Sequence, residues 1–153
     1  MVGVEGGWVK FARGMVVARA LAVAVALSLV AGCFWRSYPE RIATHADVLV
    51  SMARKGVDLL AADRMTAGTL PELIYPLERG QALAAEARRR SGSAPPPSLV
   101  AFEALLRRYR TFCEEVDRLR RERPGSGARA ALGPALHDVE RAAADVHDAV
   151  AAG

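Results

Sequence analysis

An early cysteine, Cys33, is the residue whose surroundings point most clearly to chemistry. It follows directly on Ala31 and Gly32, two side chains small enough for extended backbone to lie in the groove of a processing enzyme. As a thiolate, a cysteine is a soft nucleophile that accepts a covalent group. An apolar run over residues 20–29 precedes these residues and is suited to entering a membrane as a short helix. This arrangement makes Cys33 the candidate reactive residue of the chain.

The whole segment before Cys33 has the layout of a secretory signal. A cationic region, an apolar region and a small-residue cleavage site follow one another in the order that such signals require. The cations are Lys10, Arg13 and Arg19. Met15 is an alternative start of the chain that would make the signal more compact.

The four residues Val30-Ala31-Gly32-Cys33 resemble the lipobox of bacterial lipoproteins. In that family the cysteine sulfur is diacylated, the signal is cut before the cysteine, and the new amino terminus usually receives a third acyl chain. The resemblance covers residues 1–33 and implies that Val30, Ala31 and Gly32 are the signal-peptidase recognition residues. It also implies that membrane lipid is the partner of acylated Cys33. We recognise no family for the domain that follows.

The residue after the cysteine bears on localisation. In the enterobacterial lipoprotein pattern, an Asp at that position retains the protein in the inner membrane, and here the residue is Phe34. For a Gram-negative organism this favours the outer membrane, facing the periplasm, over the inner membrane.

Three other interpretations of the first segment remain open. Cys33 could be an ordinary buried cysteine of a core helix, it could lie in an uncleaved signal anchor, or the segment could span the membrane. A spanning helix needs about 20 apolar residues. The uncharged stretch between Arg19 and Arg36 is shorter, so spanning would require snorkelling of its flanking cations.

The histidines are the candidates for metal binding. His137 and His147 are ten residues apart, so on one helix they point about 80° away from each other and not along one face. A weak alternative site combines His147 with Asp148 and Glu140. The Glu-x-x-His signature of di-iron bundles and the Cys-x-x-Cys-His haem motif are both absent. We therefore expect no metal and no cofactor, with His45, His137 and His147 on helix flanks.

No motif in the chain predicts catalysis. A nucleophile elbow, a phosphate loop and a dinucleotide fingerprint are all missing. Acids are followed by Arg at helical spacing, as in the expected ion pairs Glu114–Arg118 and Asp117–Arg121. The formal net charge is +4, but Lys10, Arg13, Arg19 and Glu5 belong to the predicted signal, so the processed chain would carry only +2. The remaining charges are expected on solvated helix faces and do not predict nucleic-acid binding. The sequence thus predicts a protein that is not an enzyme.

Pro, Gly and Ser interrupt the chain at 67–69, 91–97 and 124–127, which leaves four segments long enough for bundle helices. Within each segment apolar residues recur at steps of three and four, the period of an amphipathic helix. The predicted stripes are Ile42, Ala46, Leu49, Ala53, Gly56 and Leu60; Leu70, Leu73, Leu77, Ala84 and Ala87; Phe102, Leu105, Tyr109, Phe112, Val116 and Leu119; and Leu132, Leu136, Val139, Ala143, Val146 and Val150.

Each segment opens with a helix-start signal. Capping boxes are predicted at 37–40 and 69–72, where a Ser or Thr and a Glu would each bond the other's backbone N–H. Ser98 is the predicted N-cap of the third helix. Pro134 is predicted at the first position of the fourth helix, where its missing N–H does no harm.

Two residues inside the predicted helices carry further expectations. Pro76 removes a backbone donor, so we expect a kink or a break near Ile74 and Tyr75. Cys113 would be the remaining free thiol after lipidation, and because a lone thiol is a hazard in an oxidising compartment, we expect it to be buried.

The chain is therefore predicted to divide into a signal over 1–32, a lipidated cysteine and short tether over 33–36, and an all-α domain over 37–153. We expect the domain to be an up-and-down four-helix bundle after an N-terminal signal helix. The predicted function is binding or scaffolding at the cell envelope, with an envelope protein as the expected partner. The alternative is a periplasmic small-ligand or metal-binding bundle that uses His137, His147 and nearby acids.

Overall fold

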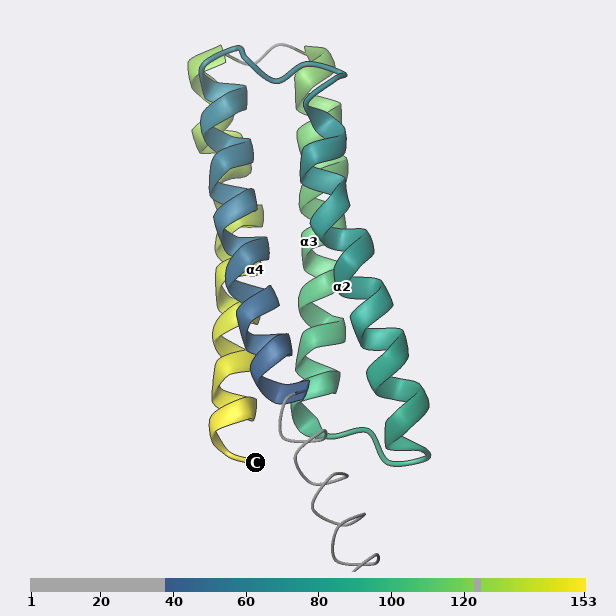
Figure 1. Cartoon of the computed structure of the whole chain (residues 1–153). Coiled ribbons are helices and arrows are strands. Elements are labelled where there is room, and N and C mark those ends of the chain that lie inside the picture. Colours follow the sequence, from purple (N-terminus) through teal and green to yellow (C-terminus); the bar gives the residue numbers. More distant parts are fainter. Residues whose placement is uncertain (1–37, 123–124) are drawn as a thin grey trace, which may run out of the picture. The chain divides into compact units, whose positions relative to one another are not determined.

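Four long helices run up and down beside one another and are joined by short loops (Figure 1). The computed structural model describes residues 38–122 and 125–153. Within these residues the elements are a helix over 38–61, α2 (Leu70–Ser91), α3 (Pro97–Glu122), a 3-10 turn (Gly125–Gly127) and α4 (Ala128–Ala151). The described residues contain no strand. The expected all-α four-helix bundle is confirmed.

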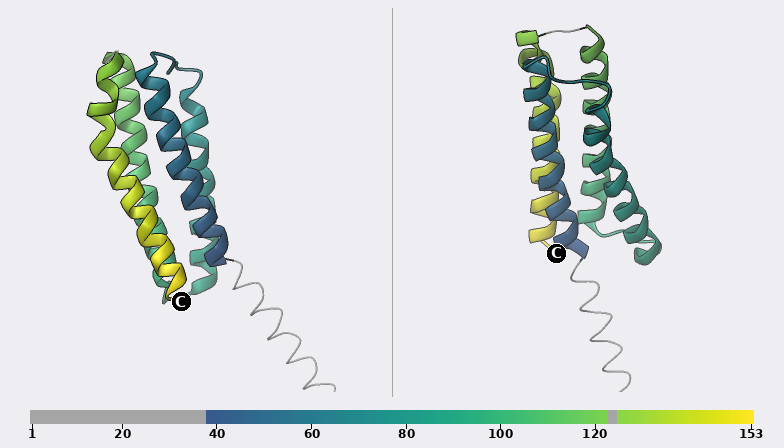
Figure 2. Two further views of the ribbon diagram at one scale, coloured as in Figure 1. Left: turned by 90° about the vertical axis from the view of Figure 1, so that its left-hand side faces the viewer. Right: turned by 45° about the horizontal axis from the view of Figure 1, so that its top comes forward.

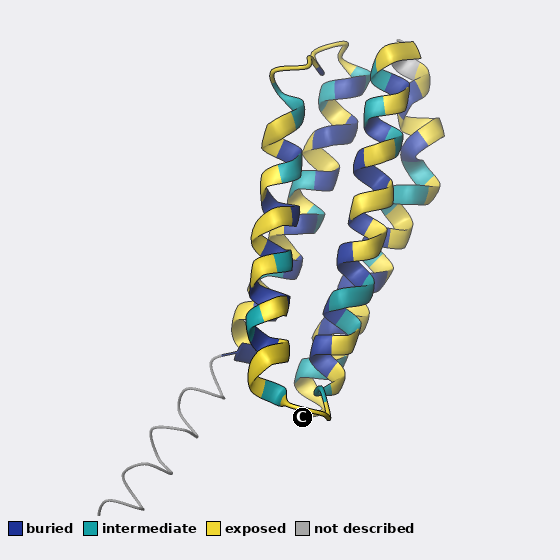
Figure 3. Ribbon diagram, turned by 90° about the vertical axis from the view of Figure 1, so that its right-hand side faces the viewer, coloured by how far each residue is buried: buried dark blue, intermediate teal, exposed yellow. Residues whose placement is uncertain are grey.

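The predicted apolar stripes form the core of the bundle. Buried residues follow one side of each ribbon, while exposed residues cover the outer surface (Figure 3). Every stripe residue predicted for helix 38–61 and α3 is buried, whereas Leu70, Leu136 and Val150 are only partly buried. The largest fully buried side chains, Tyr109, Phe102 and Phe112, all come from α3. Because α3 supplies these rings, it is the central packing element of the bundle.

Helix α2 continues through Pro76 and is not split there. A proline ring within a helix removes a hydrogen bond and crowds the preceding turn. Two side chains from neighbouring helices bond carbonyls of this region: Tyr109 donates to Leu73, and His45 Nε2 lies 2.8 Å from the Pro76 oxygen. The C-terminal half of α2 diverges from α3 (Figures 1 and 2).

The predicted start of the fourth helix is wrong. Helix α4 begins at Ala128, so Pro134 lies inside it and not at its first position. Ala128 and Leu132 are both fully buried, and the burial of these apolar side chains extends the helix upstream of the proline. Proline is permitted at the first position of a helix, but here the packing of the residues before Pro134 starts the helix at Ala128.

The predicted caps of the second and third helices are also wrong. The hydroxyl of Thr69 accepts a hydrogen bond from the backbone N–H of Thr66 at 2.9 Å and makes no capping bond to α2. Glu72 does not reach back to complete a capping box, because its carboxylate pairs with Lys55 at 3.0 Å. Helix α3 starts at Pro97, so Ser98 lies within its first turn, where it is buried. The predicted cap at Ser37 lies outside the described residues.

One end of the bundle gathers three landmarks. The start of helix 38–61, the loop between α2 and α3, and the C-terminus all lie at this end, which is the lower one in Figure 1. We call it the tether end, because the chain enters the bundle there from the N-terminal side. Residues 38–153 make up one compact unit by themselves.

Candidate functional site

The residues of the predicted lipidation site, Val30, Ala31, Gly32 and Cys33, lie outside the described residues. The structure does place the other residues singled out by the sequence. His137, His147 and their acidic neighbours lie on the outside of α4, whereas His45 of helix 38–61 is half-buried against α2 and α3. Two grooves beside α2 gather further polar side chains.

Two residues of the alternative metal site, His147 and Glu140, have separate partners, and the third, Asp148, is exposed and makes no ion pair with a described residue. His147 Nε2 lies 2.9 Å from an oxygen of Asp47 on helix 38–61. Glu140 accepts from Arg54 on the same helix at 2.7 Å, and His137 lies 2.9 Å from an Arg141 nitrogen. Across residues 38–122 and 125–153 no three metal-ligating side chains come together. The Asp47–His147 and Arg54–Glu140 contacts join α4 to helix 38–61, so their evident role is to hold the two helices in register.

Two acids of α3, Glu115 and Asp117, are held as ions by neighbouring arginines. The predicted pair Asp117–Arg121 forms at 2.9 Å, while Arg118 pairs with Glu115 and Glu122 in place of the predicted Glu114. Hydrogen bonds from Arg120 to Asp117 and from Arg118 to Glu115 lower the pKa of both carboxyl groups. A carboxyl group with a lowered pKa stays ionised and is a poor proton donor. These acids act as surface ion pairs.

The one cysteine among the described residues is buried, as predicted. Burial raises the pKa of the Cys113 thiol to about 12. Because the thiolate is the reactive form, the thiol is inert at neutral pH. Its sulfur lies 3.9 Å from the Leu73 oxygen, beside the Tyr109 hydroxyl. Cys113 is thus part of the packing between α2 and α3.

A polar pocket of about 350 Å³ lies between helix 38–61 and α2. Arg41, Arg79, His45 and Glu86 line it. At its tether end the Tyr38 ring is buried beneath Arg41, whose guanidinium carbon lies 5.1 Å from the ring centroid. Burial, and next a hydrogen bond with Glu86, raise the pKa of the Tyr38 phenol, so it stays neutral. The pocket is a structural junction between the first helix and α2.

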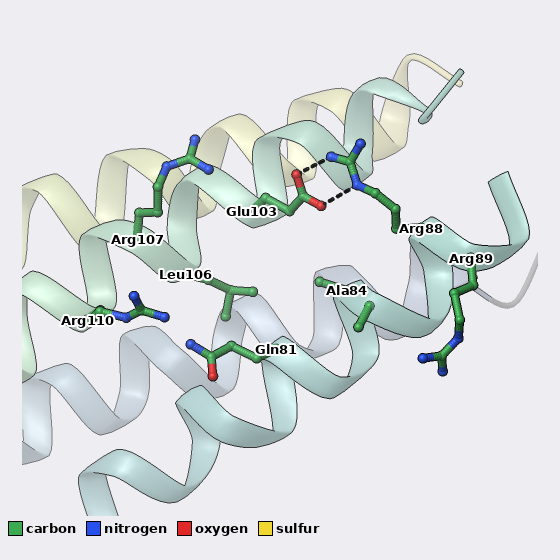
Figure 4. Close-up of a pocket in the computed structure, with 9 residues that line it drawn as sticks. Gln81, Ala84, Arg88, Arg89, Glu103, Leu106, Arg107 and Arg110 are labelled. Carbon is green, nitrogen blue, oxygen red and sulfur yellow. Dashed lines mark hydrogen bonds and ion pairs between the residues drawn. The ribbon is translucent and has the colours of Figure 1, made fainter. Parts of the chain in front are cut away.

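The groove between α2 and α3 is the larger and more apolar of the two. Its volume is about 500 Å³, and it opens broadly to the surface where α2 diverges from α3 (Figure 4). Ala84, Ala85 and Leu106 supply its apolar lining. Polar side chains surround this lining: Gln81, Arg88, Arg89, Glu103, Arg107 and Arg110. We call it the α2–α3 groove.

The charge around the α2–α3 groove is strongly positive. Arg88 and Glu103 form a bidentate ion pair across it, in which Arg88 Nε donates to Glu103 Oε1 at 2.9 Å. Arg107 and Arg110 make no ion pair with a described residue, so their guanidinium charges are not cancelled locally, whereas the charge of Arg89 helps to lower the pKa of Glu86. An apolar lining flanked by uncompensated guanidinium groups is suited to an acidic amphipathic partner.

Sequence reasoning did not find this groove. The sequence predicts that charged side chains lie on solvated helix faces, which would include Arg107 and Arg110, but their i,i+3 spacing beside Leu106 places them on the flank of the buried stripe. That flank position is the feature of the sequence from which the groove could have been suspected. The sequence does not say which helix packs beside the flank, because this depends on the tertiary structure.

Comparison with known proteins gives no family for this chain, because no family model, no curated protein and no solved structure matches it. Of the helices in the described part of the chain, none combines the length and the apolar character needed to cross a bilayer.

Proposed function

We propose that this chain is a bacterial envelope lipoprotein whose helical bundle is held at a membrane surface and acts by binding or scaffolding. The observation that carries the proposal is the sequence Val30-Ala31-Gly32-Cys33 after an apolar run and a cationic region. In this proposal the signal is cut before Cys33, and the cysteine is acylated.

The position of the chain's entry into the bundle supports anchoring. Tyr38 is the first described residue and lies at the tether end. Even fully extended, the backbone between Cys33 and Tyr38 spans at most about 18 Å. Two or three acyl chains, at about 0.8 kcal/mol per buried CH₂, would hold Cys33 in the membrane almost permanently. The bundle would therefore work close to the lipid surface and not far across the periplasm.

The chemistry of the bundle supports binding over catalysis. Ion pairing lowers the pKa of Glu115 and Asp117, and burial raises that of Cys113, so these groups are poorly suited as acids or nucleophiles at neutral pH. The α2–α3 groove, in contrast, presents an apolar surface beside unpaired guanidinium groups. For a Gram-negative host, Phe34 after the cysteine favours the outer membrane as the location.

Detergent phase partitioning tests the anchoring. The protein would be expressed in a bacterium as the wild type, as Cys33→Ala and as Cys113→Ala, and each would be partitioned between detergent and aqueous phases. We expect the wild type and Cys113→Ala in the detergent phase at the size of the processed chain, and Cys33→Ala at the size of the unprocessed chain. Cys113→Ala is the matched control, because it removes the other thiol. Equal processing of all three proteins would reject the proposal.

A further inference from the structure

We propose that the α2–α3 groove binds α4 of a second copy of this chain, so that the bundles associate side by side. The proposal goes beyond the anchoring function. The interface itself does not depend on the lipid, although its effective strength at a membrane rests on the anchoring proposed above.

The groove presents the basic half of the interface. Arg107 and Arg110 border it without ion pairs to described residues, while its single acid, Glu103, is already paired with Arg88. The apolar lining, where Ala84 and Ala85 leave room above Leu106, gives space for the surface of a helix and not for large side chains. The occupant should therefore be an acidic helix with small residues.

Helix α4 has that character on its outward face. Asp138, Asp145 and Asp148 are exposed and make no ion pair with any described residue. Their spacings of seven and three residues place them within about 80° of one another around the helix. Arg141, which contacts His137, is a cation on the same face, so the face carries three acids against one base, and its remaining side chains are small. The acidic face of α4 and the basic groove are complementary in charge.

The two surfaces also lie at matching heights along the bundle. Arg107 lies five residues after Phe102, whose ring centroid is 5.8 Å from that of His45 on helix 38–61. Asp145 lies two residues before His147, which is 2.9 Å from Asp47 on the same helix. Arg107 and Asp145 are therefore within roughly one helical turn of each other in height. Copies anchored in one membrane through the tether end can meet without an axial shift.

The interface is heterologous, because the groove of one copy receives a different surface, α4, of the next copy. Such an interface can add further copies head to tail. Because the lining is shallow and built of small residues, association in solution should be weak and sensitive to salt. Anchoring in one membrane would confine the copies and raise their effective concentration.

Sedimentation velocity of residues 34–153 tests the interface without any lipid, since residues 38–153 contain their own core. At low ionic strength and up to about 1 mM protein, we expect the sedimentation coefficient of the wild type to rise with concentration. The groove variant Arg107→Glu/Arg110→Glu and the α4 variant Asp145→Arg/Asp148→Arg should each remain monomeric.

Mixing the two variants gives the sharpest result. The groove variant keeps an intact α4 face, and the α4 variant keeps an intact groove, so one molecule of each can bind the other. The surfaces left over in that pair are both mutated and cannot bind a third molecule. An equimolar mixture should thus form a dimer and nothing larger. The matched controls Arg108→Glu and Glu114→Arg reverse exposed charges of α3 outside the groove lining and should associate like the wild type.

Several results would overturn the proposal. One is a wild type that stays monomeric at every concentration, and another is loss of association in the control variants as well. Wild-type monomers that bind phosphatidylglycerol vesicles through Arg107 and Arg110 would assign the groove to lipid instead. Circular dichroism of each variant ensures that a lost interaction is not lost folding. Because the fragment 34–153 lacks Cys33, a failure to associate in this experiment is distinct from a failure of lipidation.

Discussion

The hydroxyl of Tyr109 on α3 donates a 2.9 Å hydrogen bond to the carbonyl oxygen of Leu73 on α2. Leu73 is fully buried and stands three residues before Pro76, in the turn that the proline ring disturbs. The N–H that Pro76 lacks would have bonded the carbonyl of Glu72, so the Tyr109 bond does not replace the bond that the proline removes. It ties α2 to α3 in the turn before the proline.

Tyr109→Phe should therefore destabilise the bundle. The ring still fills its place in the core, but the buried hydrogen bond from α3 to the Leu73 carbonyl is lost, which costs about 1–2 kcal/mol of unfolding free energy. Urea unfolding followed by circular dichroism measures the change. The exposed Tyr75→Phe is the control, since its side chain is 60% exposed and its loss of a hydroxyl should have no measurable effect. Equal stability of the two variants would show that the Leu73 bond contributes nothing.

Gly80 is required by the packing of α2 against two helices. A Cβ at this position would lie 2.6 Å from Leu106 Cδ2 and 3.0 Å from His45 Nε2. Alanine favours a helix by about 1 kcal/mol over glycine. The overpacking should nonetheless win, so that Gly80→Ala is net destabilising by about 1–2 kcal/mol in thermal or urea unfolding.

The loop variant Gly68→Ala provides the comparison for Gly80. The new methyl group there would meet no atom closer than Thr66 Oγ1, at 3.6 Å. Its stability should stay level or rise by about 0.5 kcal/mol, because alanine restricts the unfolded chain. A stabilising Gly80→Ala would mean that α2 is free to move away from Leu106.

The raised pKa of Cys113 predicts how stability depends on pH. In the unfolded chain the thiol ionises near pH 9, whereas in the bundle its pKa is about 12. Between these values the unfolded state has lost a proton that the folded state keeps, so stability falls as pH rises. The contribution is fully present below about pH 8 and declines by about 1.4 kcal/mol per pH unit above pH 9.

Urea unfolding of the wild type and of Cys113→Ala between about pH 7 and pH 10 measures this slope. The alanine variant should be less stable at neutral pH yet lose less stability on going to pH 10. Parallel curves for the two proteins would exclude Cys113 as the cause. Above about pH 10 the buried Tyr109 phenol, whose pKa is also raised by burial, should steepen the fall in both.

The parts of the fold that follow from local periodicity were predictable from the sequence. The α3 stripe from Phe102 to Leu119 is buried as expected, because apolar residues at steps of three and four must share one helix face. Burial of Cys113 followed from the same stripe. Ion pairing within a helix was partly predictable. The Asp117–Arg121 pair forms as expected, but Arg118 pairs with Glu115 and Glu122 and not with Glu114.

The parts that depend on neighbouring helices were not predictable. Thr69 and Glu72 matched a capping box, but the loop and Lys55 offered competing partners that the sequence pattern does not contain. The Arg54–Glu140 contact joins positions far apart in the chain. The α2–α3 groove likewise depends on the way α2 leaves α3 after Pro76.

The central claim, that the bundle is anchored through an acylated Cys33, is tested most directly by the intact mass and N-terminal fragment masses of the wild-type protein extracted from bacterial membranes. The account predicts a chain that runs from Cys33 to Gly153 and carries two or three acyl chains on its first residue. A chain that keeps residues before Cys33, or one with an unmodified Cys33 thiol, would contradict it.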